Sequence, residues 1–167
     1  MTDIAEAILD AAERRIREAG YSGFSFRELA AEVGVKSSSV HYHFPTKARL
    51  AAAVARRYTD RFVDAVARER AAGLAPLEAW RGVFRRALQE DGRMCLCGAL
   101  AAAVRDLPDE VVVEVRRFFS LGLESLAEAG VSPDQAMRLL ATLEGAMLMA
   151  NTLGDISAFD RAMAAET

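Results

Sequence analysis

The spacing of apolar residues along the chain predicts helices from its start to its end. Apolar residues recur every four positions over residues 3–19, at Ile4, Ile8, Ala12 and Ile16. This spacing is typical of a helix with one buried face. Gly20 is a suitable residue to end that helix. Two short helices are expected next, over residues 26–33 and 37–44, with Gly34 between them and Pro45 after the second.

A longer helix is expected after Thr46, which can cap it. Its buried face would contain Leu50, Val54, Tyr58, Phe62 and Val66. Further helices are expected to begin near Pro76, Met94, Pro108 and Pro133, because proline is favoured in the first turn of a helix. A last short helix is expected over residues 155–164. Long alternations of β-branched residues are missing, so the sequence predicts an all-α fold.

Composition and charge narrow the class of protein. With 52% hydrophobic residues among 167, the chain has enough apolar material for a packed core. A net charge of −3 alone argues against a nucleic-acid-binding protein, but the positive charge gathers in residues 21–57 and the rest is acidic. The sequence contains no secretory signal pattern and no long uncharged apolar stretch. We therefore expect a cytoplasmic protein with no membrane span.

Residues 24–50 contain the most informative pattern, FSFRELAAEVGVKSSSVHYHFPTKARL. Ser25 and Glu28 form the S-x-x-E pattern of a capping box, which predicts the start of a short helix. A turn at Gly34 and a second short helix complete the layout of a helix-turn-helix. The second helix begins with three serines, whose small hydroxyl side chains allow close approach to base edges in a major groove.

In this segment the sequence resembles the TetR family of bacterial regulators. The shared pattern comprises Gly34-Val35, Tyr42-His43-Phe44, Pro45, Thr46-Lys47 and Leu50, and upstream residues 8–12, Gly20, Ser25, Leu29-Ala30 and Val33. The resemblance covers about residues 4–57. The sequence departs from the family pattern at Ser38, where many members carry glycine, and at His41, where another residue often stands. Both positions lie on the expected DNA-facing side, so the departures concern the operator sequence rather than the fold.

The resemblance implies a DNA-binding transcriptional regulator, commonly a repressor, that binds a palindromic operator as a homodimer and is released by a small ligand. A helix-turn-helix DNA-binding domain would occupy residues 1–48, and a helical ligand-binding and dimerisation domain residues 49–167. DNA contacts are expected from Ser25, Arg27, Lys36, Ser37, Ser38, Ser39, His41, Tyr42, His43 and Lys47. The three serines and His41 are the candidates for reading bases, and Lys47 is expected near the phosphates. Tyr42 and His43 could instead be packing groups.

The C-terminal region offers candidates for an effector pocket and a dimer interface. An apolar or amphipathic effector would contact Phe62, Trp80, Phe84, Met94, Cys97, Leu100, Phe118 and Met147. Each of these residues could equally belong to the core. The expected dimer contacts are Leu139, Thr142, Leu143, Ala146 and Ala150, where small residues permit close helix approach. Packing within the chain would produce the same pattern.

Other classes of function find less support in the sequence. A cysteine-dependent helical enzyme would need a histidine, yet His41 and His43 are the two in the chain and both lie in the expected DNA-reading helix. These two residues point in different directions from a helix, so we expect no metal site, and no cofactor is expected. An interaction protein that has lost DNA binding is the other alternative, which Tyr42 and Lys47 argue against. Cys95 and Cys97 could sense redox state, although burial is the ordinary role of such residues.

Overall fold

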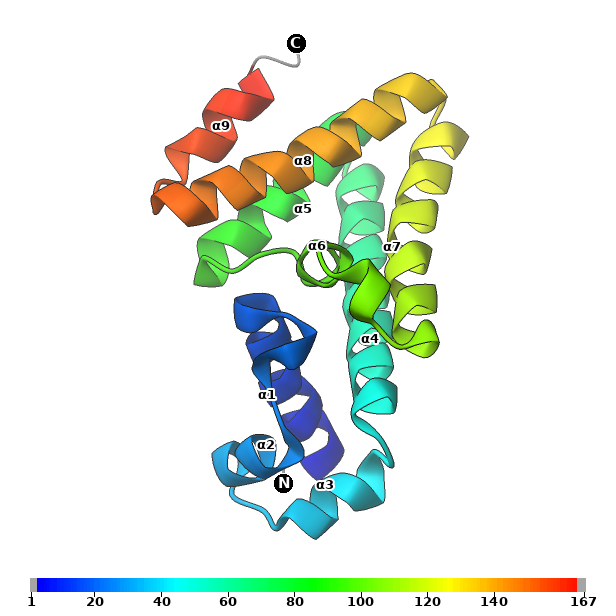
Figure 1. Ribbon diagram of the computed structural model, residues 1–167. Helices are drawn as coiled ribbons and strands as arrows, with labels where there is room; N and C mark the ends of the chain where they lie inside the picture. Colours follow the sequence, from blue (N-terminus) through cyan, green and yellow to red (C-terminus); the bar gives the residue numbers. More distant parts are fainter. Residues whose placement is uncertain (1–2, 165–167) are drawn as a thin grey trace. The chain divides into compact units, whose positions relative to one another are not determined.

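The computed structural model of the chain describes residues 3–164, and all regular structure in this range is helical (Figure 1). The predicted all-α class is confirmed. The elements in chain order are α1 (Ile4–Ala19), η1 (Tyr21–Gly23), α2 (Phe26–Val33), α3 (Ser37–His43), α4 (Lys47–Ala71), α5 (Pro76–Asp91), α6 (Leu96–Ala101), η2 (Val104–Asp106), α7 (Asp109–Glu128), α8 (Pro133–Leu153) and α9 (Ser157–Ala164). None of the described helices is both long and apolar enough to cross a bilayer.

Local signals set the ends of the first helices. The Asp3 side chain accepts a hydrogen bond of 3.0 Å from the Ala5 backbone nitrogen and so caps α1. The predicted capping box of α2 is confirmed, because the Glu28 backbone nitrogen donates to the Ser25 hydroxyl at 3.3 Å. Gly34 ends α2 with a φ of 77°, a left-handed conformation that side-chain-bearing residues rarely adopt. The helix-turn-helix is therefore specified by residues close together in the chain.

The segment after Met94 is less regular than the single helix expected there. Helix α6 begins at Leu96 and ends at Ala101, and the 3₁₀ turn η2 follows it. At this point the backbone hydrogen bonds shorten by one residue, because Ala103 donates to Leu100 at 3.1 Å and Asp106 donates to Ala103 at 2.9 Å. Bonds of this span tighten the chain into a 3₁₀ turn and end the α-helix.

The helices group into two compact units. The first contains residues 3–58 and 96–116. In it α1 packs against α2, α3 and α6. Its buried apolar residues include Ile8, Ile16, Leu29, Val40, Leu50, Val54, Leu96 and Leu100. This division by contacts differs from the functional boundary expected at residue 48, which stays a prediction.

Ion pairs join the surface helices of the first unit. Glu32 of α2 accepts hydrogen bonds from Arg14 at 2.8 Å and Arg15 at 3.0 Å, both on α1. Arg57 of α4 donates to three carboxylates on α1, those of Glu6, Asp10 and Glu13, at 2.7, 2.8 and 3.1 Å. Together these ion pairs hold α1 against both α2 and α4, and they stabilise the helix-turn-helix through its contact with α1.

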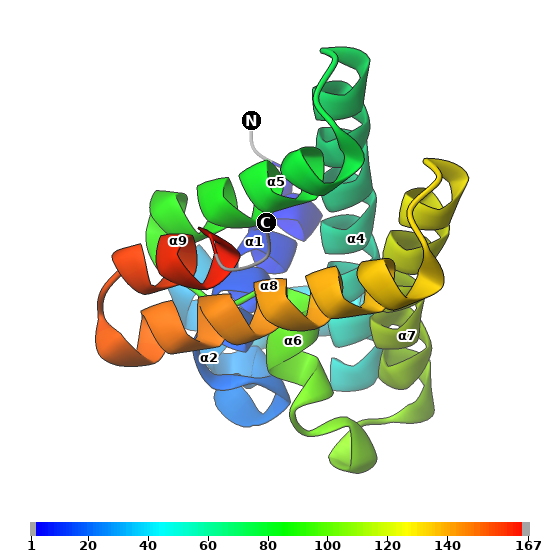
Figure 2. The ribbon, with the colours of Figure 1, turned by 90° about the horizontal axis from the view of Figure 1, so that it is seen from above.

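The second unit contains residues 59–95 and 117–164 of the described chain. Helix α8 packs against α5 and α9 in it, as Figure 2 shows from above. Its core holds a group of aromatic side chains centred on Phe62, with ring centroids 5.7 Å from Trp80, 5.0 Å from Phe84 and 5.4 Å from Phe118. Offset and edge-on rings at such distances are favourable aromatic contacts. Arg85 and Asp160 join α5 to α9 by two hydrogen bonds of 2.7 and 3.0 Å.

Candidate functional site

Helix α3 is fixed in the first unit by its apolar side. Val40 is completely buried, and α2 packs along α3. The turn between the two helices is closed by the Val35 backbone nitrogen, which donates to the Ala30 carbonyl at 2.9 Å. The short helix cannot be expected to persist alone, because helices of two turns are unstable in water without tertiary packing. Val40 and the turn therefore determine which side chains of α3 face outward.

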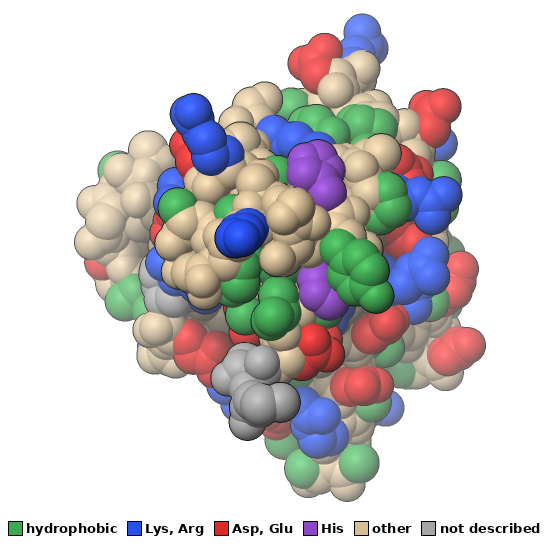
Figure 3. Space-filling view, turned by 90° about the horizontal axis from the view of Figure 1, so that it is seen from below, with side chains coloured by type: hydrophobic (Ala, Val, Ile, Leu, Met, Phe, Trp, Pro, Cys, Tyr) green, Lys and Arg blue, Asp and Glu red, His purple; other side chains and the backbone are tan. Residues whose placement is uncertain are grey.

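The outward side of α3 is polar and open. Lys36, Ser37, Ser38, His41 and Tyr42 are exposed, and Tyr42 retains 83% of its accessible surface. Figure 3 shows this side of the molecule, with the histidines in purple among tan atoms of the backbone and of side chains that are neither charged nor hydrophobic. The other two predicted contacts on α3, Ser39 and His43, are half-buried. Five of the predicted DNA-contacting residues thus share one accessible surface, which we call the α3 face.

An aromatic contact orients His41 on the α3 face. The His41 ring lies edge-on to Phe26, the first residue of α2, with ring centroids 4.6 Å apart. Sequence analysis did not single out Phe26. The signal available in the sequence was an aromatic residue next to the N-cap Ser25, at a position that the buried stripe of α2 does not use; in the structure Phe26 is half-exposed. Phe26 limits the directions that the His41 ring can take.

Of the two residues at the start of α2 that are predicted to contact phosphates, Ser25 already makes a side-chain hydrogen bond within the protein. The Ser25 hydroxyl donates to the Glu28 carboxylate at 2.7 Å, and this bond lowers the pKa of Glu28. A phosphate contact from Ser25 would require the hydroxyl to turn away from Glu28. Arg27 lies exposed beside them, available for an anion. The roles of Ser25 and Arg27 toward DNA stay predictions.

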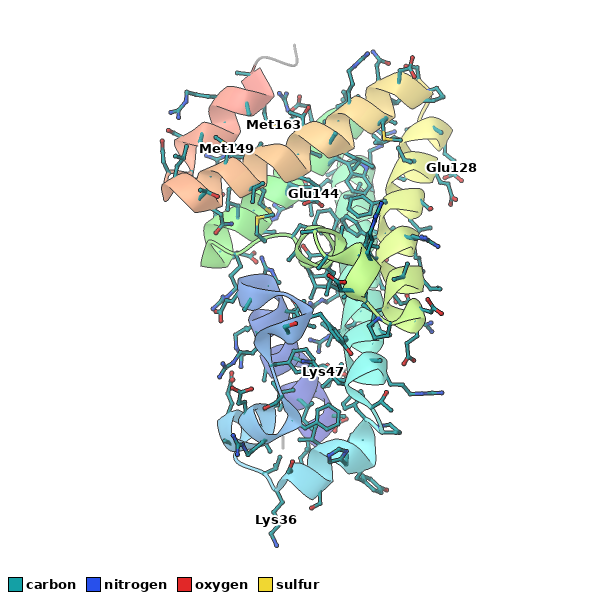
Figure 4. All side chains as sticks on the ribbon, in the orientation of Figure 1. Lys36, Lys47, Glu128, Glu144, Met149 and Met163 are labelled. Atoms are coloured by element: carbon teal, nitrogen blue, oxygen red, sulfur yellow. The ribbon has the colours of Figure 1, made fainter. Side chains whose placement is uncertain are left out.

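Lys47 has a structural role that the sequence did not indicate. Its ammonium donates to the Phe24 carbonyl at 2.6 Å and lies 4.8 Å from the centre of the Tyr21 ring and 4.5 Å from that of Phe24 (Figure 4). Partial burial lowers the pKa of Lys47, and the charge of Glu28 acts in the opposite direction. Lys47 therefore connects the start of α4 to the segment before α2. Its expected phosphate contact stays a prediction.

Lys47→Ala is accordingly expected to destabilise the protein. The substitution removes one charge-assisted hydrogen bond and two cation–π contacts, worth about 1–3 kcal/mol together. Urea unfolding should show this loss. Arg49→Ala, which removes an exposed positive charge two residues along α4, is the matched control and should change the free energy of unfolding by less than about 0.5 kcal/mol. Equal stability of the two variants would contradict the role given to Lys47.

The residues predicted to contact an effector are divided between the two units. Phe62, Trp80, Phe84, Met94, Phe118 and Met147 belong to the second unit, whereas Cys97 and Leu100 belong to the first. Met94 is half-buried, and the other seven are at most 5% exposed. The aromatic members contact one another, as core residues do. These contacts favour the alternative that the aromatic residues form the core. Contact between the predicted residues and an effector stays a prediction.

The residues predicted for the dimer interface lie mostly on the inner side of α8. Leu139, Leu143, Ala146 and Ala150 are each at most 3% exposed, and Thr142 is half-buried. Packing within the chain therefore accounts for this stripe of residues. This is the alternative to a dimer interface that the sequence had left open. The opposite side of α8 exposes large apolar residues instead: Met137, Leu148, Met149 and Leu153, with 53–58% of their surface accessible. We call these four residues the outer α8 face.

The fold and the α3 face define a helix-turn-helix DNA-binding protein. Residues 8–54 match the family model of bacterial regulatory proteins of the tetR family. A TetR family transcriptional regulator from Agrobacterium tumefaciens has the same fold, with 28% sequence identity, a TM-score of 0.89 and coverage of 95% of this chain and 93% of that chain. A TetR transcriptional regulator from Legionella pneumophila is 27% identical, with a TM-score of 0.88 over 99% of this chain and 96% of that one. No curated protein matches the sequence.

The chain is therefore similar to TetR family transcriptional regulators, in residues 8–54 by sequence and over nearly its whole length by fold, as the sequence predicted. The reduced form of NemR from Escherichia coli shares the fold at a TM-score of 0.83, with 20% identity over 99% of this chain and 96% of that chain. At that identity the likeness concerns the fold alone.

Proposed function

We propose that this protein is a homodimeric repressor that binds a palindromic operator through the α3 face of each protomer and is released by a small ligand. The observation that carries the proposal is the α3 face itself, where small and polar side chains are exposed on a helix fixed by the buried Val40. A helix that enters a major groove needs such a surface. We propose repression rather than activation because repression is the commoner case in the family that the sequence resembles.

Within the α3 face we assign different tasks to different residues. Ser37 and Ser38 lie at the start of α3 and are proposed to read base edges, since the N-terminal part of a recognition helix approaches the bases. His41, four residues after Ser37 and so about one turn further along the same side, is proposed to read a base edge beside them. Lys36 and Tyr42 are proposed to contact phosphates from either end of the face. The edge-on contact with Phe26 supports a role for His41, because a side chain held in one orientation reads a base edge with better-defined geometry.

The outer α8 face is the surface proposed to join the two protomers. From Ala141 to Leu153, Glu144 is the single charged residue in α8. Four large apolar side chains on one helix face make an unusual surface for a monomer and a suitable one for a symmetric interface. Dimerisation through this face would give the operator two recognition helices, which palindromic half-sites require.

Leu148→Glu is expected to separate the protomers and, with them, to abolish tight operator binding. Two like charges brought together at a two-fold interface cost several kcal/mol, so the dimer should weaken by roughly 100-fold or more. Analytical ultracentrifugation measures the dimer, and fluorescence anisotropy on the operator duplex measures the second effect. Val113→Glu on α7, where 59% of the side chain is exposed, is the control and should remain dimeric. A dimeric Leu148→Glu variant would contradict the proposed interface.

Ligand release is proposed to act through the second unit, as a shift between dimer arrangements that fit and do not fit the two half-sites. A ligand can cause this change only by binding one arrangement more tightly than the other. The chain supports such a role, because α4 and α7 each contain residues of both units. A ligand that binds the protein but leaves operator affinity unchanged would contradict this part of the proposal.

A further inference from the structure

Glu144 stands out among the carboxylates of the described chain because both of its oxygens are buried and neither accepts a hydrogen bond from a nitrogen or oxygen donor. It lies in the middle of α8, as Figure 4 shows, on the helix that otherwise carries no charge from Ala141 onward. Burying a carboxylate without a charged partner is costly, so proteins usually pair or neutralise such a group.

Two other carboxylates with little exposed surface have arginine partners. Glu114 is 3% exposed, and Arg56 donates to it twice, at 3.0 and 2.5 Å. Glu13 accepts a hydrogen bond from Arg57 at 3.1 Å. Among the described residues no cation is paired with Glu144; burial raises its pKa to about 7, while a hydrogen bond from the Cys95 thiol acts to lower it. In the described part of the chain this buried acidic group thus lacks a positive charge beside it.

The groups near Glu144 include a thiol and a thioether, which are polarisable and largely apolar. Cys95 is completely buried, and its backbone nitrogen donates to the Met147 sulfur at 2.9 Å. That sulfur is therefore already in use as an acceptor. Thiol and thioether groups are polarisable and adapt to the shape of an apolar ligand. Such surroundings add contact area for a ligand but supply no charge to balance the carboxylate.

A second unsatisfied polar group lies on the same side of α8. Asn151 follows Glu144 by seven residues, or two helical turns, which places the two on one face about 10 Å apart. The Asn151 amide nitrogen is buried and donates no hydrogen bond. Asn151 also lines a cavity of about 220 Å³, together with the apolar or small residues Leu88, Gly92, Ala150, Gly154 and Ile156 and with Asp155, whose carboxylate already accepts hydrogen bonds from Ser157. Space for an apolar group therefore exists along this face of the helix.

We infer that Glu144 is the binding site for the positively charged head of an organic cation, whose apolar part packs along the same face of α8. An ammonium group supplies the charge and the hydrogen-bond donors that the two carboxylate oxygens lack. This inference rests on the proposed ligand-released function in one respect, namely that the cation would be the effector. The binding site itself does not depend on that function.

Three compounds with the same chain test the charge preference: hexylammonium, 1-hexanol and hexanoate. Butylammonium and octylammonium extend the series to shorter and longer chains. Each is titrated by calorimetry into the full-length protein without DNA. Hexylammonium should bind the wild type about tenfold or more tightly than 1-hexanol does, and hexanoate should bind most weakly. Equal affinity for the ammonium and the alcohol, or no saturable binding by any of the ammonium ions, would overturn the inference.

Glu144→Gln identifies the responsible group. This variant keeps the shape of the side chain and removes its charge, so hexylammonium should lose about tenfold in affinity while 1-hexanol keeps its own. Glu128→Gln, which removes an exposed carboxyl on α7, should behave as the wild type. A preference for ammonium that survives in Glu144→Gln would place the cation elsewhere and overturn the assignment. Should that variant fail to fold, the comparison of compounds on the wild type still decides.

These titrations contain no DNA, so they separate the two hypotheses. Operator binding measured by anisotropy can fail while hexylammonium still binds, which would overturn the proposed function and keep the cation site. Cation binding can fail while the operator is bound, which would overturn the cation site and keep the proposed function.

Discussion

Glu144→Gln should be more stable than the wild type by about 3 kcal/mol near pH 8, and by little near pH 5. The ordinary pKa of this carboxyl is 4.5, and burial raises its pKa to about 7 in the folded protein. Between these two values the folded state keeps a proton that the unfolded state releases. The free energy of unfolding therefore falls as pH rises from about 4.5 to 7 and changes no further above that range.

Urea unfolding at a fixed protein concentration, repeated from about pH 5 to pH 8, measures this difference. Subtracting the glutamine variant removes the titration of all other groups, which the two proteins share. Glu128→Gln should follow the wild type across the series, because its carboxyl is exposed on α7 (Figure 4). Parallel pH profiles for the wild type and Glu144→Gln would contradict the burial of an unpaired carboxyl at this position.

Phe62→Ala is expected to cost about 3–5 kcal/mol of stability. Phe62 is 5% exposed and contacts the rings of Trp80, Phe84 and Phe118, so truncation would leave a cavity in the second unit. Phe62→Leu retains most of the apolar volume and should cost about 1 kcal/mol. Chemical unfolding measures both.

The same pair of variants decides between two interpretations of the aromatic group. Core residues lose stability when truncated, whereas residues that line an open ligand pocket lose little and change ligand affinity instead. A stability loss below about 1 kcal/mol in Phe62→Ala would contradict the core interpretation and restore the predicted pocket.

The parts of this protein that local signals specify could be predicted from the sequence. Ser25, Glu28 and Gly34 act within a few residues of themselves, through a capping box and a left-handed turn. Their chemistry therefore set the ends of α2, and the family resemblance followed from the same short segment. The exposure of Ser37, Ser38 and His41 also follows, once Val40 is recognised as the buried residue of α3.

Features that depend on distant residues could not be predicted in this way. Helix α8 is apolar on nearly all sides, so its sequence did not indicate whether Leu139 or Leu148 would face inward. Lys47 has the position of a phosphate contact in the motif, yet the Phe24 carbonyl, distant in sequence, holds its ammonium. Glu144 resembled an ordinary charged residue until the fold placed it among buried apolar neighbours. In each case tertiary packing determined the environment.

The central claim is that the α3 face binds operator DNA, and a salt series tests it most directly. Fluorescence anisotropy would follow the protein on duplex DNA from its own upstream intergenic region, beside a duplex of scrambled sequence. Lys36→Ala removes the exposed cation at the start of the α3 face (Figure 4), and Arg116→Ala removes an exposed cation on α7 as the matched control. Each lost phosphate contact should reduce the slope of log affinity against log salt by about one unit per protomer.

We predict saturable binding that favours the upstream duplex, a salt slope of several units, and a weaker, flatter response for Lys36→Ala alone. Failure of the wild type to bind either duplex even at low salt, or identical salt slopes for the two variants and the wild type, would contradict the account.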